Sequence, residues 1–190
     1  YAAWKFILYT MTGSVFMLVG ILSLYFINHA VTGEYTFDIT KYYVLYPSLN
    51  LQMWLFAAFA ISFAIKVPIF PFHTWQPDTY EQSPTTVTML LSGVMVKMGL
   101  VAMIRWMLPI LGIGTFIWSD VVICLSVIGI LYASLIAIRQ DDLKRFIAYS
   151  SIAHMGLTVA ALFSLTGFSN NSNVYLHYHQ VGFQGVLLQL

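Results

Sequence analysis

The chain has 190 residues, of which 59% are hydrophobic and only 8% are charged, and its formal net charge is +1. Ordinary soluble domains carry about 25% charged residues, so this composition excludes a soluble globular domain. The near-neutral charge argues against a nucleic-acid-binding protein, which needs a basic face. A single cysteine, Cys124, excludes a disulfide framework and a cluster of thiolate metal ligands.

Apolar stretches of membrane-spanning length recur along the chain, whose mean hydropathy is +0.81. A helix needs about 20 mostly apolar residues to cross a bilayer, because its backbone groups must be satisfied within the segment. The sequence therefore predicts an all-α, polytopic transmembrane helix bundle, with five full spans and the start of a sixth near Val174. The five full spans are expected from about Phe6 to Ile27, Leu51 to Phe72, Thr86 to Leu108, Phe116 to Ile138, and Phe146 to Leu165.

Basic residues in short loops predict the orientation of these spans. If the five spans cross the membrane in alternating directions, one side of the membrane receives Lys5, the loop 73–85 and the stretch RQDDLKR, from Arg139 to Arg145. The other side receives fewer basic groups, so the first side is expected to face the cytoplasm or its organellar equivalent. Within RQDDLKR, Asp141 or Asp142 is expected to be the N-cap of the following helix.

Two lysines lie inside the predicted spans. A charged group near the bilayer centre costs at least about 2.5–3.5 kcal/mol, and such groups often mark ion pathways. Lys97 is expected near the midplane and Lys66 near the end of its span. Either lysine could instead extend its ammonium to the interface, more easily Lys66 than Lys97. Arg105 is expected to be an interfacial anchor.

Pro68 and Pro71 follow Lys66 closely. Each proline removes a backbone donor and clashes with the preceding turn, so the helix should be broken between Lys66 and Pro71. Unpaired carbonyls at membrane depth are tolerated where the backbone is buried in protein or lines a watery cavity. The break therefore predicts water at this depth, and the end of a half-helix dipole beside Lys66.

Histidines are natural proton carriers between two lysines, because their unperturbed pKa is about 6.5. His73 lies seven residues beyond Lys66, and His154 lies inside the fifth predicted span. A lone histidine in a bundle is more often a hydrogen-bonded packing residue, so that alternative remains open. His177 and His179 are weak candidates for a metal site, because no carboxylate or cysteine accompanies them. No Asp or Glu lies in the middle of any predicted span.

Motifs of soluble enzymes are missing from the sequence. It contains no phosphate-binding glycine loop, no HExxH and no CxxC. Ser150 and His154 lie four residues apart, but no third group accompanies them to complete a hydrolase triad.

Two long motifs resemble a known family. KVPIFPFHTWQPDTYEQSPTTVTMLLSGVMVKMG, from Lys66 to Gly99, and LYASLIAIRQDDLKRFIAYSSIAHMGL, from Leu131 to Leu157, resemble the signature regions of the antiporter-like proton-pumping subunits of respiratory complex I. Among these subunits the chain is most similar to chain M of bacterial NADH-quinone oxidoreductase, the equivalent of mitochondrial subunit 4.

The resemblance implies a fold of about fourteen helices in two inverted repeats, each with one discontinuous helix. Residues 1–190 would form part of a single transmembrane antiporter-like domain that is truncated at both ends. The glutamate that pairs with Lys66 in the family would then precede Tyr1, and a charged residue of the second repeat would follow Leu190.

The resemblance also implies roles for individual residues. Lys66 and Lys97 match the two lysines of the first repeat, and His73 and His154 match histidines along the hydrated axis between the half-channels. These four residues are the expected proton relay. Lys5 matches a lysine of the preceding helix, but an interfacial anchor explains it equally well. Asp78 and Glu81 are expected to be solvated.

By this resemblance the chain would be a membrane subunit of NADH:quinone oxidoreductase, a translocase whose proton transfer is coupled to quinone reduction in other subunits. NADH, FMN, iron–sulfur clusters and quinone are expected in partner subunits, with no cofactor and no metal in this chain. The expected partners are other membrane subunits of complex I, the lipid bilayer and protons, in a bacterial plasma membrane or an energy-transducing organellar membrane. The alternatives are a subunit of a sodium/proton antiporter or membrane-bound hydrogenase, and a non-pumping membrane anchor.

Overall fold

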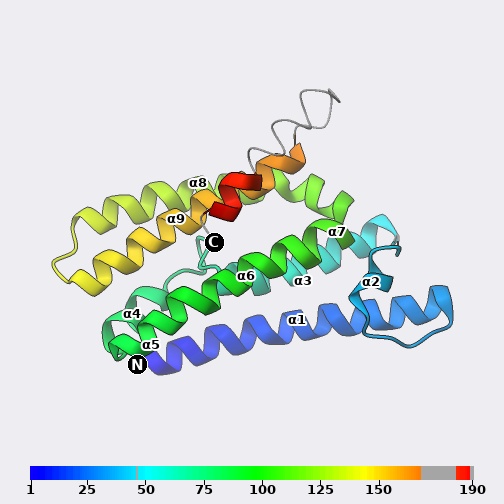
Figure 1. Ribbon diagram of the computed structural model, residues 1–190, viewed down its shortest axis with the longest axis horizontal. Coiled ribbons are helices and arrows are strands. Elements are labelled where there is room, and N and C mark those ends of the chain that lie inside the picture. Colours follow the sequence, from blue (N-terminus) through cyan, green and yellow to red (C-terminus); the bar gives the residue numbers. More distant parts are fainter. Residues whose placement is uncertain (46, 168–182, 189–190) are drawn as a thin grey trace.

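Helices run along the long axis of the molecule (Figure 1). The computed structural model describes residues 1–45, 47–167 and 183–188. Within these residues five helical stretches are long and apolar enough to cross a membrane. No strand occurs in the described residues. The predicted all-α transmembrane helix bundle is therefore confirmed.

Most of the observed helices extend a few residues beyond their predicted bounds. The third predicted span is a single helical stretch, Thr85–Ile110, in which two π-helical turns interrupt the α-helix. The sixth predicted span, with His177 and His179, begins outside the described residues, although residues 183–188 are helical. The helices are α1 (Ala2–Thr32), α2 (Ile39–Tyr42), α3 (Leu49–Lys66), α4 (Trp75–Gln82), α5 (Thr85–Leu90), η1 (Leu91–Met95), α6 (Val96–Ala102), η2 (Met103–Met107), α7 (Leu108–Ile110), α8 (Gly112–Ile138) and α9 (Leu143–Gly167).

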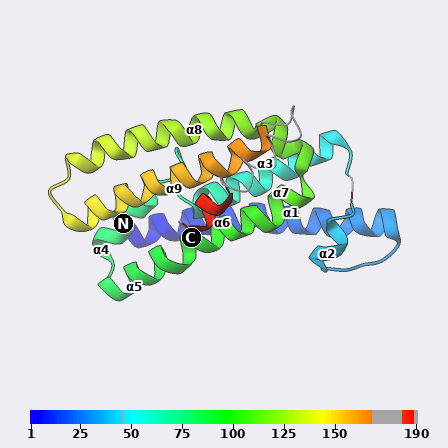
Figure 2. The ribbon, with the colours of Figure 1, turned by 45° about the horizontal axis from the view of Figure 1, so that its top comes forward.

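The core of the bundle forms around α3. Its aromatic side chains Phe56, Phe59 and Phe63 are almost fully buried, and they share a hydrophobic cluster with residues of η2 and α9. Helices α8 and α9 form a hairpin on one side, while α1 packs along α3 on the other (Figure 2). Since α3 is enclosed on several sides, its last residue, Lys66, lies inside the bundle and not at its periphery.

The basic segments lie at one end of the bundle, as expected for spans that cross the membrane in alternating directions. The Nζ atom of Lys5 in α1 lies 2.7 Å from a carboxylate oxygen of Asp78 in α4, and the Nζ atom of Lys144 in α9 donates to the carbonyl of Ser83 at 2.9 Å. Asp142 accepts a hydrogen bond from the backbone of Lys144 at 2.9 Å. Its role as the N-cap of α9 is confirmed.

The expected break separates α3 from α4. Pro68 has no N–H to donate to the carbonyl of Ala64, and the N–H of Ile69 donates to that oxygen instead, at 2.9 Å. This shift deprives the Ile65 carbonyl of its usual donor. The indole Nε1–H of Trp75 donates to it at 2.8 Å, in a buried hydrogen bond. A side chain thus satisfies the Ile65 carbonyl that the break leaves without a backbone donor. A cis peptide bond joins Phe70 and Pro71.

The π-helical turns η1 and η2 flank α6, the segment that carries Lys97. The sequence analysis did not predict them. Pro109 has no N–H to donate to the carbonyl of Arg105, and the hydroxyl of Tyr43 donates to that oxygen at 3.2 Å. The second π turn therefore lies next to a gap in the helical hydrogen bonds that Pro109 causes. Tyr43, an exposed residue directly after α2, covers this gap.

Gly99 in α6 packs directly on the break. A Cβ atom at this position would lie 2.6 Å from the Cγ2 of Val67 and 3.3 Å from the Cβ of Lys66. Only a residue without a side chain fits this close approach. Gly99 therefore allows the helix with Lys97 to touch the end of the helix with Lys66.

We expect Trp75→Phe to lower the free energy of unfolding, because it leaves the buried Ile65 carbonyl without a donor, at a cost of about 1–3 kcal/mol. Thermal unfolding of the detergent-solubilised protein measures the change. Trp118→Phe is the matched control, since Trp118 Nε1 has no hydrogen-bond partner among the described residues. Equal effects of the two substitutions would contradict this account of the break.

We expect Gly99→Ala to destabilise the protein by about 1–3 kcal/mol, because its methyl group would overlap the buried Val67 side chain. Gly93→Ala is the control, since a Cβ at Gly93 has nothing within 4 Å. Both substitutions gain helix propensity, so their difference in denaturation midpoint isolates the steric overlap. A Gly99→Ala variant as stable as Gly93→Ala would show that α6 can move away from the break.

Candidate functional site

Lys66 is the last residue of α3 and is half-buried. Its Nζ atom lies 3.7 Å from the Sδ atom of Met17 in α1. A thioether sulfur is only a weak acceptor, so this contact leaves most of the donor capacity of the ammonium unused. No carboxylate forms an ion pair with Lys66 within the described part of the chain. The negative end of the α3 dipole supplies the nearest compensation for its charge.

His73 lies in the break between α3 and α4 and is only 3% exposed. Its ring packs against Tyr132 of α8, with a centroid distance of 5.2 Å, and against Phe70 at 5.7 Å. The Nδ1 atom is buried without a hydrogen-bond partner among the described residues. Burial lowers the pKa of His73 below its ordinary value, and the positive charge of Lys5 lowers it further. Both effects favour the neutral imidazole form of His73.

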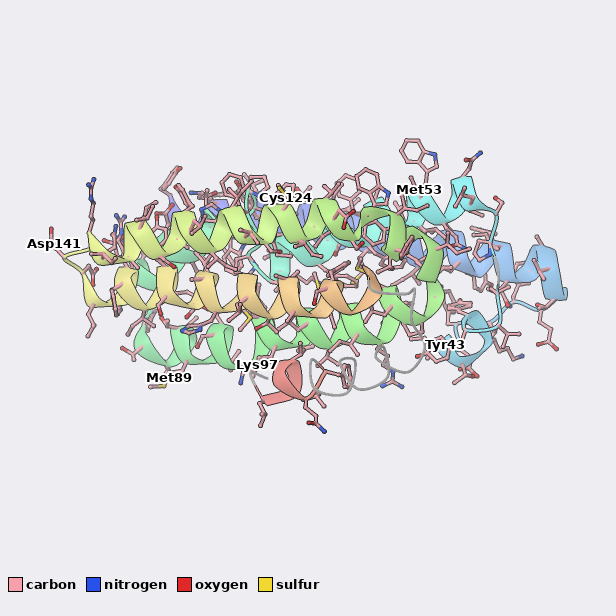
Figure 3. The ribbon with its side chains drawn as sticks, turned by 90° about the horizontal axis from the view of Figure 1, so that it is seen from above. Tyr43, Met53, Met89, Lys97, Cys124 and Asp141 are labelled. Atoms are coloured by element: carbon pink, nitrogen blue, oxygen red, sulfur yellow. The ribbon has the colours of Figure 1, made fainter. Side chains whose placement is uncertain are left out.

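Lys97 lies in α6 between the two π-helical turns. Its side chain lines an open groove of about 400 Å³ together with Arg105 and several apolar side chains. Figure 3 shows Lys97 at the margin of the bundle, and in that view the helical residues 183–188 lie next to it. In residues 1–45, 47–167 and 183–188, neither Lys97 nor Arg105 forms an ion pair.

His154 lies on an exposed side of α9. Its backbone carbonyl accepts a hydrogen bond from the hydroxyl of Thr158 at 2.9 Å. Among the described residues no hydrogen bond joins its imidazole to Lys66, His73 or Lys97. His154 thus has no direct side-chain link to the other three predicted relay residues in that part of the chain.

The structure brings the predicted residues together only in part. Lys66 and His73 lie at the two ends of the same break, and Gly99 brings the helix of Lys97 against the backbone of Lys66 and Val67. Within the described ranges, no direct hydrogen bond links the side chains of the four predicted residues. Proton transfer among them would need water or further side chains as intermediates.

An apolar cavity lies beside the break. This cavity has a volume of about 270 Å³ and is lined by apolar side chains of α3, α8 and η2, together with Ile69, Phe70 and Phe72. Apolar cavities remain dry. Trp75 satisfies the Ile65 carbonyl, one of the groups that was expected to need water, and water elsewhere at the break stays a prediction.

The expectation that Asp78 and Glu81 are solvated is wrong. Asp78 pairs with Lys5 and, at 3.7 Å, with Arg145, while a Glu81 carboxylate oxygen lies 2.7 Å from the Arg145 Nε atom. The side chains of Asp78 and Glu81 are only 26% and 28% exposed. Their i,i+3 spacing, which puts both acids on one helical face, was the signal in the sequence. Together they tie α4 to α1 and α9.

Comparisons with known proteins agree with this architecture. The family model described as "NADH:quinone oxidoreductase/Mrp antiporter, TM" matches residues 1–189. NADH-quinone oxidoreductase subunit M of Rickettsia conorii is 44% identical over 166 residues, which cover 87% of this chain and 33% of that protein. The chain thus spans about a third of the length of the curated relatives it matches.

Solved structures of two membrane complexes contain chains with a similar fold. A chain of respiratory complex I from Thermus thermophilus superposes with a TM-score of 0.76 at 25% identity, covering 98% of this chain and 40% of that chain. A chain of the archaeal membrane-bound sulfane sulfur reductase superposes with a TM-score of 0.70 at 26% identity, covering 99% and 40%. The resemblance found in the two signature motifs is confirmed. This chain belongs to the NADH:quinone oxidoreductase/Mrp antiporter transmembrane family.

Proposed function

We propose that the chain is a membrane subunit of an NADH:quinone oxidoreductase and that it carries protons through Lys66, His73, Lys97 and His154. The observation that carries the proposal is Lys66, a half-buried lysine at the end of a broken helix whose backbone touches the helix of a second lysine. Membership of the family and the likeness to subunit M support it.

Lys66 would hold the proton at the start of this relay. The C-terminal end of α3 favours its ammonium through the helix dipole, while burial opposes a charge there. A carboxylate brought close to Lys66 would favour the charged form, and its withdrawal would favour release of the proton. That carboxylate would come from a residue outside these 190, since the described part of the chain supplies none to Lys66.

His73 and Lys97 would receive the proton in turn. The neutral imidazole of His73 has a ring nitrogen without a hydrogen-bond partner among the described residues, so it can accept a proton as well as pass one on. Lys97 opens onto a groove that is wide enough for water. His154, exposed on α9, would continue the relay beyond Lys97 only with the help of residues that pack against this face.

The redox chemistry would take place in partner subunits. We propose that NADH, FMN, iron–sulfur clusters and quinone bind there, and that this chain contributes proton translocation to the enzyme as a whole. Other membrane subunits and lipid would cover the exposed apolar side chains of α1 and α8, among them Leu8, Leu18, Val121 and Leu131.

A second candidate is a subunit of a sodium/proton antiporter or of a membrane-bound hydrogenase-like complex. The family description includes the Mrp antiporter, and an archaeal sulfane sulfur reductase complex contains a chain with this fold. In these systems the lysines could carry protons in the same way, while the reaction coupled to proton transfer would differ from quinone reduction by NADH. A non-pumping membrane anchor, in which the lysines only pack helices together, is the alternative of another class.

We expect Lys97→Ala to reduce proton translocation on the order of tenfold, since one proton-carrying group contributes at least that much to a transfer. The complex should still assemble, because Lys97 makes no ion pair in the described residues. Proton uptake by vesicles containing the complex measures the effect. Arg105→Ala is the matched control, since Arg105 lines the same groove but is exposed. Normal translocation by Lys97→Ala would favour the membrane anchor.

Sodium separates the first two candidates. We expect NADH-driven proton translocation to continue at the same rate in sodium-free medium, because lysine and histidine side chains carry protons and provide no oxygen ligands for a metal cation. Proton and sodium fluxes in the same vesicles check this. Translocation that requires sodium and proceeds without NADH:quinone activity would favour the antiporter.

A further inference from the structure

The start of α1 packs against the segment that holds His73. The Nζ atom of Lys5 lies 2.7 Å from a carboxylate oxygen of Asp78, and the hydroxyls of Tyr9 and Thr74 are 3.0 Å apart. Lys5 and Tyr9 are one helical turn apart and so lie on one face of α1. Thr74 directly follows His73. These two contacts fix the position of a charged pair relative to the buried imidazole.

The Lys5–Asp78 pair is itself sheltered from solvent. Its side chains are 20% and 26% exposed, so its charges are screened less than those of a surface pair. His73 is more deeply buried, at 3% exposure. A charge near a buried imidazole therefore acts on its protonation more strongly than the same charge would act in water.

Other titratable groups surround this end of the bundle. Tyr132 of α8 packs edge-on against the His73 ring, and Tyr149 of α9 interacts electrostatically with Tyr132. The charged and titratable groups at this end include Lys5 and Tyr9 from α1, Asp78, Tyr80 and Glu81 from α4, Tyr132 from α8, Asp142 at the start of α9, and Lys144, Arg145 and Tyr149 from α9.

Among these groups, the charge of Lys5 is the one that lowers the pKa of His73. Its positive charge disfavours the imidazolium form and adds to the effect of burial, so that both causes lower the pKa of His73. Asp78 lies 2.7 Å from the Nζ atom of Lys5. A carboxylate charge has the opposite sign to that of Lys5, so it is expected to favour the imidazolium form that Lys5 disfavours.

We propose that the Lys5–Asp78 ion pair sets how readily His73 accepts a proton, and that it thereby regulates the relay in which His73 takes part. The second half of this proposal rests on the proposed function of the chain, whereas the first half does not. Lys5 and Asp78 are positioning residues in this account, because they act through the imidazole and carry no proton along the path themselves.

Two single substitutions should shift the protonation of His73 in opposite directions. Lys5→Met removes the positive charge and leaves Asp78 in place, so the midpoint of His73 titration should rise. Asp78→Asn leaves the charge of Lys5 uncompensated, so the midpoint should fall. Each shift is expected to be about half a pH unit, and the double variant should return close to the wild-type midpoint.

Deuterium exchange of the imidazole C2 hydrogen, followed by mass spectrometry of the His73 peptide over a pH series, measures this midpoint in the intact complex. Lys41→Met is the matched control, because Lys41 forms an ion pair with Glu34 in the loop after α1, at the other end of that helix. It should leave the His73 midpoint unchanged. Lys5→Arg, which keeps the charge, should also leave it unchanged and decides the test if Asp78→Asn does not assemble.

The pH profile of proton translocation, recorded for the same variants, separates the two proposals. If the His73 titration midpoints of Lys5→Met and Asp78→Asn move apart, and the pH profile of each variant shifts in the same direction as its midpoint, the inference is supported in full. If the midpoints move apart but His73→Gln pumps normally, the pair controls His73 and the proposed relay through His73 is wrong. If the midpoints of Lys5→Met and Asp78→Asn coincide, the inference is overturned, even where His73→Gln abolishes pumping.

Discussion

The hydrogen bond from the Trp75 indole to the Ile65 carbonyl is the interaction on which the rest of the site depends. Pro68 breaks the backbone ladder, and an unpaired carbonyl at this depth would cost about 1–3 kcal/mol. Trp75 removes that cost for the Ile65 carbonyl from within the chain. The turn that brings Trp75 back toward Ile65 also places His73 beside α8 and lets α6 approach Val67 through Gly99.

Much of this architecture follows from local sequence. The apolar stretches predict the spans because a bilayer imposes a minimum length on each helix, and Pro68 and Pro71 predict the break because proline cannot donate to the helix ladder. Lys66 and Lys97 stand out for the same reason as any charge in an apolar span. Each of these inferences needs only the properties of a residue and its nearest neighbours in the sequence.

Other features depend on contacts between distant segments and so were not predictable. The donor for Ile65 is a side chain ten residues away, and the partner of Asp78 is 73 residues away in α1. The π turn Leu91–Met95 contains no proline from which it could have been predicted. The sequence also did not reveal that Trp75 satisfies the Ile65 carbonyl, and water at the break stays a prediction. The relay roles of Lys66, His73, Lys97 and His154 stay predictions that mutagenesis must test.

The length of α1 has a consequence for the charges at its start. Its 31 residues span about 46 Å at 1.5 Å per residue, which exceeds the hydrocarbon thickness of about 30 Å. The helix must therefore tilt or project into the headgroup layers. Lys5, in the first turn of α1, then meets Asp78 in the zone between hydrocarbon and water. The local lipid composition and bilayer thickness thus become physical variables that act on this ion pair, alongside pH and salt.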